Sequence, residues 1–216
     1  MEEVYRIVVD EGEGFLEEKR SKFLSVIFAV ENEEEALQRI NQIRKKHWDA
    51  RHHVFAYVIG ERDEIVRASD DGEPSGTGGK PVLDVLKGAG LHNVCLVVTR
   101  YFGGTLLGTG GLIRAYGGAA KDAVENAGIS EKMKGIMAET VVEYTDLGKL
   151  EYLLRENQVT TLDTGYTDKV ELTLLIPAKD ESRIRELLTE ESGGRITLGE
   201  GMEVAYIETK NGPKVL

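Results

Sequence analysis

Hydrophobic residues in the first part of the chain follow two periods, one typical of strands and one typical of helices. Apolar residues at every second position predict a strand over residues 22–30, and apolar residues three or four apart predict a helix over residues 33–47. A nearly continuous apolar run at residues 93–99 is typical of a strand buried on both faces. The remaining elements predicted here are strands over residues 54–59 and 64–68 and helices over residues 81–87 and 112–127.

The pattern restarts after a turn-like stretch at residues 126–131. Strands are predicted over residues 134–144, 159–163, 169–176 and 196–207, and helices over residues 146–156 and 180–188. Asp180 is placed to cap the second of these helices. The resulting βαββαβ order is that of a ferredoxin-like domain. The sequence therefore predicts an α+β protein with two domains, over residues 1–128 and 129–216.

Composition narrows the class of protein. Hydrophobic residues make up 41% of the 216 residues, and no apolar run reaches the roughly 18 residues that a membrane span needs. The N-terminus is acidic and has no apolar signal core, and the single cysteine, Cys95, cannot form an internal disulfide. We therefore expect a cytoplasmic protein that does not enter the membrane, with Cys95 in the core.

The charge balance limits how the chain can bind nucleic acid. The net charge is −11, with −5 on residues 1–128 and −6 on the remainder, which argues against a broad basic surface. A local basic patch on an acidic body stays compatible with this balance. Lys19, Arg20 and Lys22 form one small basic group, which we interpret as a solvated strand end.

Glycine is concentrated around a tetrapeptide, GTGG, that occurs at residues 76–79 and again at residues 108–111. Neither copy is a nucleotide-binding motif, because Pro74 and Pro81 break the P-loop pattern and Ile113 replaces the last glycine of the dinucleotide fingerprint. Two interpretations stay open: tight turns before helices, or backbone N–H groups that surround a phosphate or carboxylate. The second interpretation uses the amides of Gly78, Gly79, Gly110 and Gly111.

Basic side chains near both glycine tracts favour the anion interpretation. Arg100 and Tyr101 end the predicted buried strand, where ligand sites tend to form, and an arginine beside an aromatic ring suits phosphate or base binding. We predict that Lys80, Arg100 and Arg114 converge on one concave patch. The candidate ligand-binding residues are Ser75, Gly78, Gly79, Lys80, Arg100, Tyr101, Gly110, Gly111 and Arg114.

Three carboxylates lie in the same stretch. Asp70, Asp71 and Glu73 either hold a turn through side-chain hydrogen bonds or share a Mg²⁺ ion with a phosphate. His52 and His53 are adjacent on a strand and therefore point to opposite faces. A hydrolytic pair of Ser75 and His52 is a lesser alternative.

The runs ASDDGEPSGTGGKPVLDVL and VVTRYFGGTLLGTGGLIRAYGGAA resemble the IMPACT family, in its two-domain bacterial form. The resemblance implies a first domain of the ribosomal protein S5 second-domain type and a ferredoxin-like second domain, as in the last two domains of elongation factor G. It also implies a role near translation, since the eukaryotic relatives are translational regulators. The motif positions that it marks as a surface are Asp70, Asp71, Glu73, Ser75, Lys80, Arg100, Tyr101, Arg114 and Tyr116.

These observations lead to two hypotheses about function. The first is a binding protein whose partner is RNA, the ribosome or a translation-regulatory protein. The second is a Mg²⁺-dependent enzyme that acts on a nucleotide or another phosphorylated ligand through Asp70, Asp71 or Glu73. The first is preferred, because glycine-rich loops with Lys80, Arg100 and Arg114 form a candidate patch on an otherwise acidic body.

Overall fold

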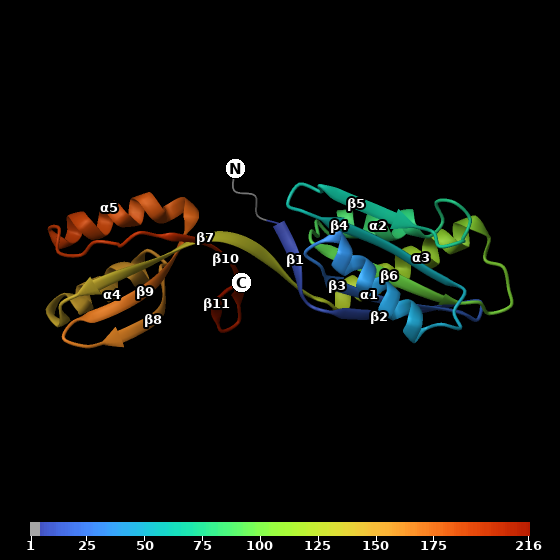
Figure 1. Cartoon of the computed structure of the whole chain (residues 1–216), viewed down its shortest axis with the longest axis horizontal. Helices are drawn as coiled ribbons and strands as arrows, with labels where there is room; N and C mark the ends of the chain where they lie inside the picture. Colours follow the sequence, from blue (N-terminus) through green and yellow to red (C-terminus); the bar gives the residue numbers. More distant parts are fainter. Residues whose placement is uncertain (1–4) are drawn as a thin grey trace. The chain divides into compact units, whose positions relative to one another are not determined.

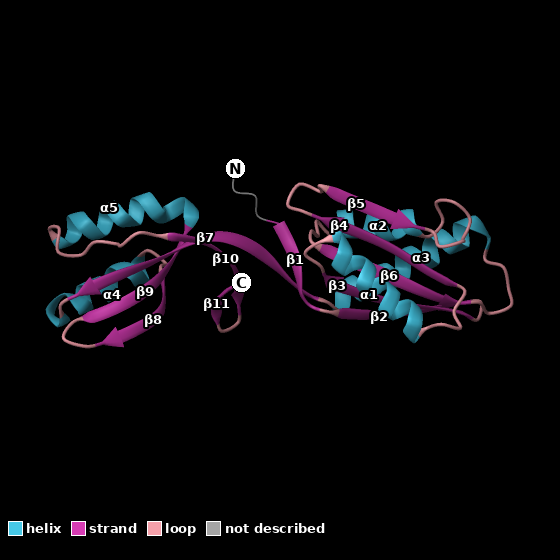
Figure 2. Cartoon of the chain, in the orientation of Figure 1, coloured by secondary structure: helices cyan, strands magenta, loops and turns pink. Residues whose placement is uncertain are grey.

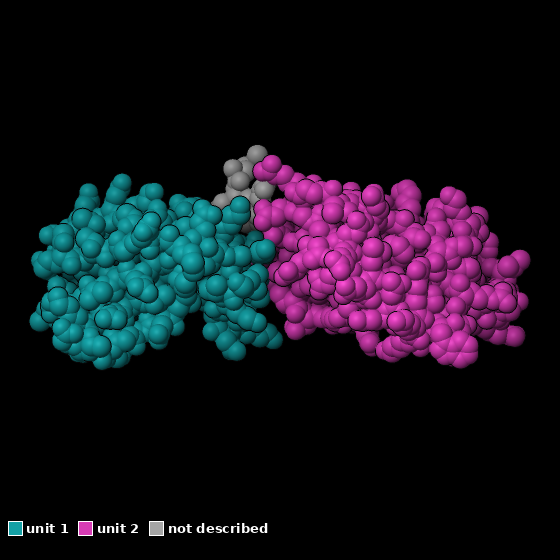
Figure 3. Space-filling model, viewed as in Figure 1, with its two compact units in different colours: residues 1–4, 132–216 teal, residues 5–131 magenta. Residues whose placement is uncertain are grey.

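The computed structural model describes residues 5–216 and divides them into two compact units. We call residues 5–131 the N-terminal unit and residues 132–216 the C-terminal unit (Figure 3). Both contain helices and strands (Figure 2), so the α+β class predicted from the sequence is confirmed. Among the described residues, no helix combines the length and the apolar character needed to cross a membrane.

The N-terminal unit is built on an antiparallel sheet in the order β2-β3-β6-β4-β5. Helix α1 lies on one face, and α2 and α3 lie on the other (Figure 1). The bounds of these elements are β1 Tyr5–Asp10, β2 Gly12–Glu18, β3 Ser21–Ala29, α1 Glu33–Lys46, β4 His52–Ile59, β5 Ile65–Ser69, α2 Gly79–Gly88, β6 Val94–Tyr101 and α3 Gly108–Asn126.

Strand β6 is the central strand, and it is buried on both faces as its apolar run predicts. Leu96 and Val98 belong to the core under α2 and α3, whereas Cys95 and Val97 belong to the core under α1. Cys95 has no exposed surface, and burial raises the pKa of its thiol far above the usual range. Cys95 is therefore a core residue and not a nucleophile.

Strand β2 was not predicted, because its sequence GEGFLEE is rich in glycine and glutamate. The structure explains the glycines by a close approach of β2 to α3. A Cβ atom added to Gly14 would lie 2.5 Å from both the backbone nitrogen of Ala123 and the Ser25 hydroxyl, and one added to Gly12 would overlap the Ala123 carbonyl. Glycine is thus required for packing against backbone, which a hydrophobic pattern does not report.

We expect Gly14→Ala to lower the free energy of unfolding by about 1–3 kcal/mol, because the new methyl group must displace helix backbone. Gly88→Ala is the matched control: nothing lies within 4 Å of its added Cβ, so its stability should be unchanged or slightly raised. Urea unfolding followed by circular dichroism measures both. Equal stability of the two variants would contradict the close approach.

The C-terminal unit has a sheet in the order β11-β10-β7-β9-β8, with all neighbouring strands antiparallel. Helices α4 and α5 pack on the same core as the inward face of β9, which carries Val170, Leu172, Leu174 and Ile176. The bounds are β7 Gly128–Val142, α4 Tyr144–Glu156, β8 Thr160–Tyr166, β9 Val170–Pro177, the 3₁₀ turn η1 Ala178–Asp180, α5 Glu181–Ser192, β10 Met202–Thr209 and β11 Gly212–Val215.

Three predictions in this region differ from the structure. Strand β7 begins at Gly128, so the predicted turn-like boundary lies partly within a strand. Residues 196–201 are irregular, although Ile196 and Leu198 are buried, and the last strand, β10, begins only at Met202. Asp180 stands at the N-cap of α5 but makes no capping bond; its carboxylate accepts from Arg183 instead.

Candidate functional site

The first glycine tract is organised around Asp70, the residue that follows β5. Its carboxylate accepts backbone hydrogen bonds from Gly76 at 2.8 Å and from Gly78 and Gly79 at 2.9 Å each. Burial alone would raise the pKa of Asp70, but the three N–H donors outweigh it and hold the pKa below the usual range. These amides therefore bind an internal carboxylate, and the expectation that Gly78 and Gly79 offer them to an external anion is wrong.

Asp71 points in a different direction from Asp70. Its backbone φ is +44°, and its carboxylate accepts from Arg44 of α1 at 2.8 Å and from the backbone N–H of His53 in β4 at 2.6 Å. Asp70, Asp71 and Glu73 therefore have separate partners and do not fit a shared Mg²⁺ ion. Within residues 5–216 the structure has no group of three His, Cys, Asp or Glu side chains arranged to hold a metal.

Glu73 is the carboxylate of a buried polar cluster. Its Oε1 accepts from Nη1 of Arg100 at 2.5 Å and from the Tyr116 hydroxyl at 2.8 Å. The Arg100 and Glu73 side chains are only 6% and 5% exposed. Burial and the nearby Glu73 charge raise the pKa of Tyr116, so this hydroxyl stays protonated and donates. The cluster links the first loop to β6 and α3.

Arg100 points inward because residues alternate along β6. It shares a face with Val98 and Leu96 and lies opposite Phe23 of β3 and His52 of β4. Its guanidinium carbon lies 5.5 Å from the centroid of the Phe23 ring and 5.6 Å from that of Phe102. These rings shield the charge but provide no oxygen acceptor, and Nε of Arg100 has no hydrogen-bond partner within the described chain.

A cavity of about 350 Å³ opens beside this cluster. Arg51, His52, Glu73 and Arg100 line it together with apolar side chains that include Phe102 and Leu107. His52 Nδ1 lies 2.8 Å from the Asp71 carbonyl oxygen, and its Nε2 lies 3.9 Å from Glu73 Oε1. The cavity therefore has apolar side chains in one part of its lining and, in the other, charged groups that include the Arg100–Glu73 ion pair.

The second glycine tract forms the first turn of α3. Gly108 has a φ of +71°, and no described side chain caps the first amides of this helix. Gly108, Thr109 and Gly110 are exposed, and the first two line the cavity. Unlike the first tract, this one keeps its amides free of an internal carboxylate, although Gly110 and Gly111 themselves do not line the cavity.

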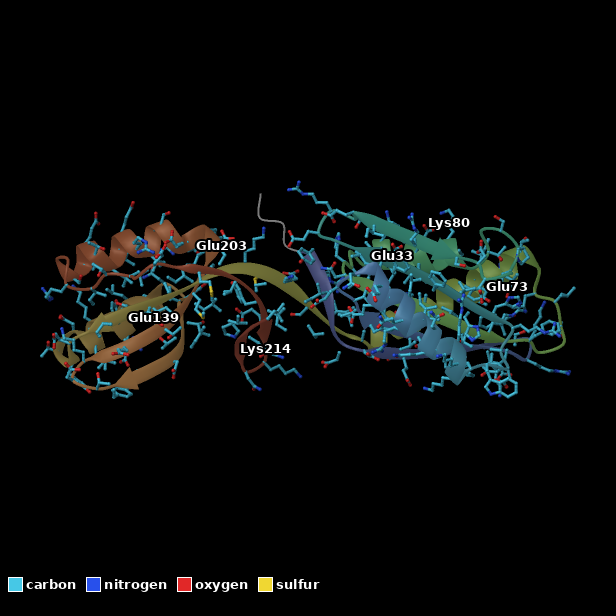
Figure 4. All side chains as sticks on the ribbon, viewed as in Figure 1. Glu33, Glu73, Lys80, Glu139, Glu203 and Lys214 are labelled. Atoms are coloured by element: carbon cyan, nitrogen blue, oxygen red, sulfur yellow. The ribbon has the colours of Figure 1, made fainter. Side chains whose placement is uncertain are left out.

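The predicted convergence of three cations on one patch does not occur. Lys80 is exposed on α2 and forms an ion pair with Asp84 at 2.8 Å, while Arg114 is exposed on α3. Of the three, only Arg100 lines the cavity. Figure 4 shows Lys80 above the strands and Glu73 nearer the end of the N-terminal unit. Ser75 is exposed in the loop between these two residues.

Tyr101 connects the end of β6 to the end of α1. Its hydroxyl lies 2.9 Å from Nδ1 of His47 and 3.3 Å from the Asp49 carboxylate. Lys22 lies opposite Tyr101 in the sheet, which places the turn between β2 and β3 at the same sheet end. This contact brings two separate basic segments together.

We call the cations at this sheet end the basic end, and its members are Lys19, Arg20, Lys22, Lys45 and Lys46. All five are exposed, and none forms an ion pair within the part of the chain that the structure describes. The nearby acidic residues include Glu13, which lines a cavity with Lys46, and also Glu17, Glu18 and Asp49, so five cations exceed these four carboxylates by one. Two members of the basic end, Lys45 and Lys46, stand just before Trp48 in the sequence KKHW, a local signal that the spacing of apolar residues in the predicted helix does not reveal.

Two aromatic side chains lie beside the basic end. Trp48, the single tryptophan, is 82% exposed, and Phe102 is 39% exposed. The Arg51 guanidinium carbon lies 5.6 Å from the Phe102 ring centroid. The Trp48 ring exposes a large apolar surface to solvent among lysine side chains, and exposed apolar surface rimmed by polar residues is typical of interaction sites.

Comparison with known proteins identifies relatives over nearly the whole chain. Residues 19–124 match the family model described as Impact N-terminal domain, and residues 140–195 match a domain of unknown function, DUF1949. The chain is 42% identical over 204 residues to IMPACT family member YvyE of Bacillus subtilis, with 94% of each chain covered. It is 36% identical to IMPACT family member YigZ of Escherichia coli, covering 83% of this chain and 89% of that protein.

More distant and structural relatives agree with these matches. Protein IMPACT-B of Xenopus tropicalis is 33% identical over 95 residues, which cover 42% of this chain and 30% of that protein. A solved crystal structure titled only as that of a hypothetical protein has 34% sequence identity and a TM-score of 0.60. That likeness covers 92% of this chain and 97% of the other.

Proposed function

The chain belongs to the IMPACT family, and from that premise we propose that it is a translation-associated protein that binds RNA through its basic end. The observation that carries this proposal is the group of unpaired lysine and arginine side chains beside the exposed Trp48. The translational role that the resemblance implies for eukaryotic relatives supports a role in translation for this chain. The lysine, arginine and tryptophan side chains of the basic end support the binding of nucleic acid.

Single-stranded nucleic acid is the ligand that this surface suits. Lysine and arginine side chains attract phosphates, and exposed aromatic rings stack on bases, each stacked base contributing about 1–3 kcal/mol. The acidic remainder of the chain, with its net charge of −11, repels other parts of the RNA. Binding is therefore expected to stay local and to depend strongly on salt.

The test is a titration of the whole chain with single-stranded oligouridine, followed by quenching of Trp48 fluorescence. We expect the double variant Lys45→Ala, Lys46→Ala to bind more weakly. If both lysines contact phosphates, the slope of log affinity against log salt becomes less negative by about 1.4, at roughly 0.7 for each contact with a single strand. The same titration with ribosomes extends the measurement to the cellular partner.

The matched control removes two lysines elsewhere in the N-terminal unit. Lys87 and Lys121 are exposed and paired with Asp63 and Glu125, so Lys87→Ala, Lys121→Ala makes the same change in net charge away from the basic end. Equal weakening by the two double variants would show that only net charge matters and would reject the site. Nuclease-insensitive capture of a translation factor, without RNA affinity, would favour a protein partner instead.

The finer fold assignments belong to the same proposal. We propose a ferredoxin-like C-terminal unit, which is supported by the βαββαβ order and the strand order β10-β7-β9-β8. We assign the N-terminal unit to the ribosomal protein S5 second-domain type by the family resemblance. The alternative of a Mg²⁺-dependent enzyme receives no support from the separated carboxylates Asp70, Asp71 and Glu73.

A further inference from the structure

The cavity beside Arg100 has a chemistry distinct from that of the basic end. Its volume of about 350 Å³ is at the lower end of the roughly 300–1,000 Å³ typical of small-molecule sites. Much of its wall is apolar, including Phe102, Leu107 and Leu112, which suits neither a ribose nor a phosphate. The polar groups lie on the remaining wall. This division predicts a ligand with an apolar body and a polar head.

Arg100 supplies the first evidence for the nature of that head. The side chain is buried, and Glu73 accepts from its Nη1 at 2.5 Å, while Nη2 has only a long contact of 3.4 Å to Ser21 Oγ. Its Nε has no acceptor in the described structure. A buried donor without a partner is destabilising, and more so when it is charged. The guanidinium that lines the cavity therefore has hydrogen-bonding capacity that the described chain does not use.

The charges around the cavity set the charge of the head. Arg51 and Arg100 are cationic and Glu73 is anionic, which leaves one net positive charge at the wall. A phosphomonoester has about two negative charges near neutral pH, whereas a carboxylate has one. The single excess charge therefore matches a carboxylate.

The start of α3 supplies a second set of donors. Gly108 and Thr109 line the cavity, and no described side chain caps the first amides of this 19-residue helix. The helix dipole adds positive potential at this end. Since Arg100 lines the same cavity, the helix end and the guanidinium provide two independent sets of donors for one anion.

We propose that this cavity binds a small organic carboxylate with an aromatic or branched aliphatic body. The carboxylate accepts from Arg100, Arg51 and the first amides of α3, and the body packs against Phe102, Leu107 and Leu112. This site is separate from the proposed RNA surface and does not depend on it.

The experiment titrates the whole, isotopically labelled chain with benzoate, phenylpyruvate and 3-methylbutanoate and follows the backbone amide resonances. We expect saturable shifts of the Gly108 and Thr109 amides. Benzamide, which keeps the ring without the charge, should bind at least tenfold more weakly, because it cannot form the charge-assisted hydrogen bonds of a carboxylate. Tenfold corresponds to about 1.4 kcal/mol. Inorganic phosphate and adenosine monophosphate should not compete.

Two variants test the donors separately. Arg51→Ala removes an exposed cation and should weaken benzoate binding about tenfold, since charge-assisted hydrogen bonds contribute about 1.5–3 kcal/mol. Thr109→Pro removes one amide in the first helical turn, where proline is tolerated, and should weaken it as well. Thr109→Ala keeps the amide and should bind as the parent does. Oligouridine affinity should stay unchanged in both Thr109 variants.

Several results would overturn the proposal. They are no saturable shift with any of the three carboxylates, equal binding of benzamide, or tighter binding of phosphate than of benzoate. Loss of oligouridine binding in Lys45→Ala, Lys46→Ala with benzoate binding intact supports both proposals as separate sites. If oligouridine does not bind but benzoate does, the RNA proposal is rejected and the carboxylate proposal is kept. The failures of the two proposals are therefore distinguishable.

Discussion

Glu73→Gln is expected to lower the free energy of unfolding by about 3–5 kcal/mol, the cost of leaving a buried charge without its partner. Arg100 is 6% exposed and its only carboxylate neighbour in the described ion pairs is Glu73 at 2.5 Å. Glutamine keeps the shape and one acceptor oxygen but removes the compensating charge. The Tyr116 hydroxyl, which donates to the same oxygen, loses a charged acceptor as well. Urea unfolding followed by circular dichroism measures the change.

A second substitution separates charge from packing. Adding Arg100→Met to Glu73→Gln removes the uncompensated cation and should recover part of the lost stability, since an apolar residue of similar length is tolerated where the pair was. Tyr116→Phe should cost less than Glu73→Gln, about 1 kcal/mol for one hydrogen bond. A double variant less stable than Glu73→Gln alone would show that Arg100 contributes chiefly through its packing between Phe23 and Phe102.

Asp70→Ala is expected to lower the free energy of unfolding by about 3 kcal/mol, because three backbone donors lose a charged acceptor at once. The amides belong to Gly76, Gly78 and Gly79, so the loop and the start of α2 lose their common support. Asp84→Ala is the control: it removes an exposed carboxylate of the same unit and should change stability by less than about 0.5 kcal/mol. The same unfolding measurement compares them.

The pH dependence of this difference follows from the lowered pKa of Asp70. A carboxylate whose pKa is lower in the folded state than in the unfolded state stabilises the fold at pH values above its unfolded pKa of about 3.9. That contribution is lost as the pH falls through the folded pKa. The gap in stability between the parent and Asp70→Ala should therefore be constant near neutral pH and shrink below about pH 4. A gap that grows on acidification would contradict the assignment.

Most helices and strands could be predicted because burial imposes a period on the sequence. The run at residues 93–99 became β6, buried on both faces, and the helical spacing at residues 33–47 became α1. Strands β1, β2 and β11 were not predicted, and β1 was missed although its sequence YRIVVD is largely apolar. The other two owe their position to other forces. Strand β2 depends on glycines that let backbone approach α3, and β11 is a four-residue edge strand with little apolar surface.

The candidate site was predicted less well than the fold. The stretch at residues 69–81 was correctly singled out as structurally important. A glycine tract does not reveal, however, which anion its amides bind, and in the structure they bind the carboxylate of Asp70 from the same stretch. Arg100 was singled out as a surface cation, whereas alternation along β6 turns it inward onto Glu73. Lys19, Arg20 and Lys22 were identified as a basic group, but their approach to the end of α1 was missed. It depends on the pairing of Lys22 with Tyr101 and on the contact of Tyr101 with His47, which are far apart in the sequence.

The seclusion of Cys95 has a consequence for the behaviour of the chain under oxidative conditions. Cys95 is the one cysteine in the sequence, and its side chain has no exposed surface. Burial raises the pKa of its thiol, so the thiol stays protonated. Peroxides and disulfides react with exposed thiolates, so neither sulfenic acid nor covalent cross-links between chains should form while the N-terminal unit stays folded. Oxidation of a cysteine is thereby closed to this protein as a means of control while the N-terminal unit stays folded.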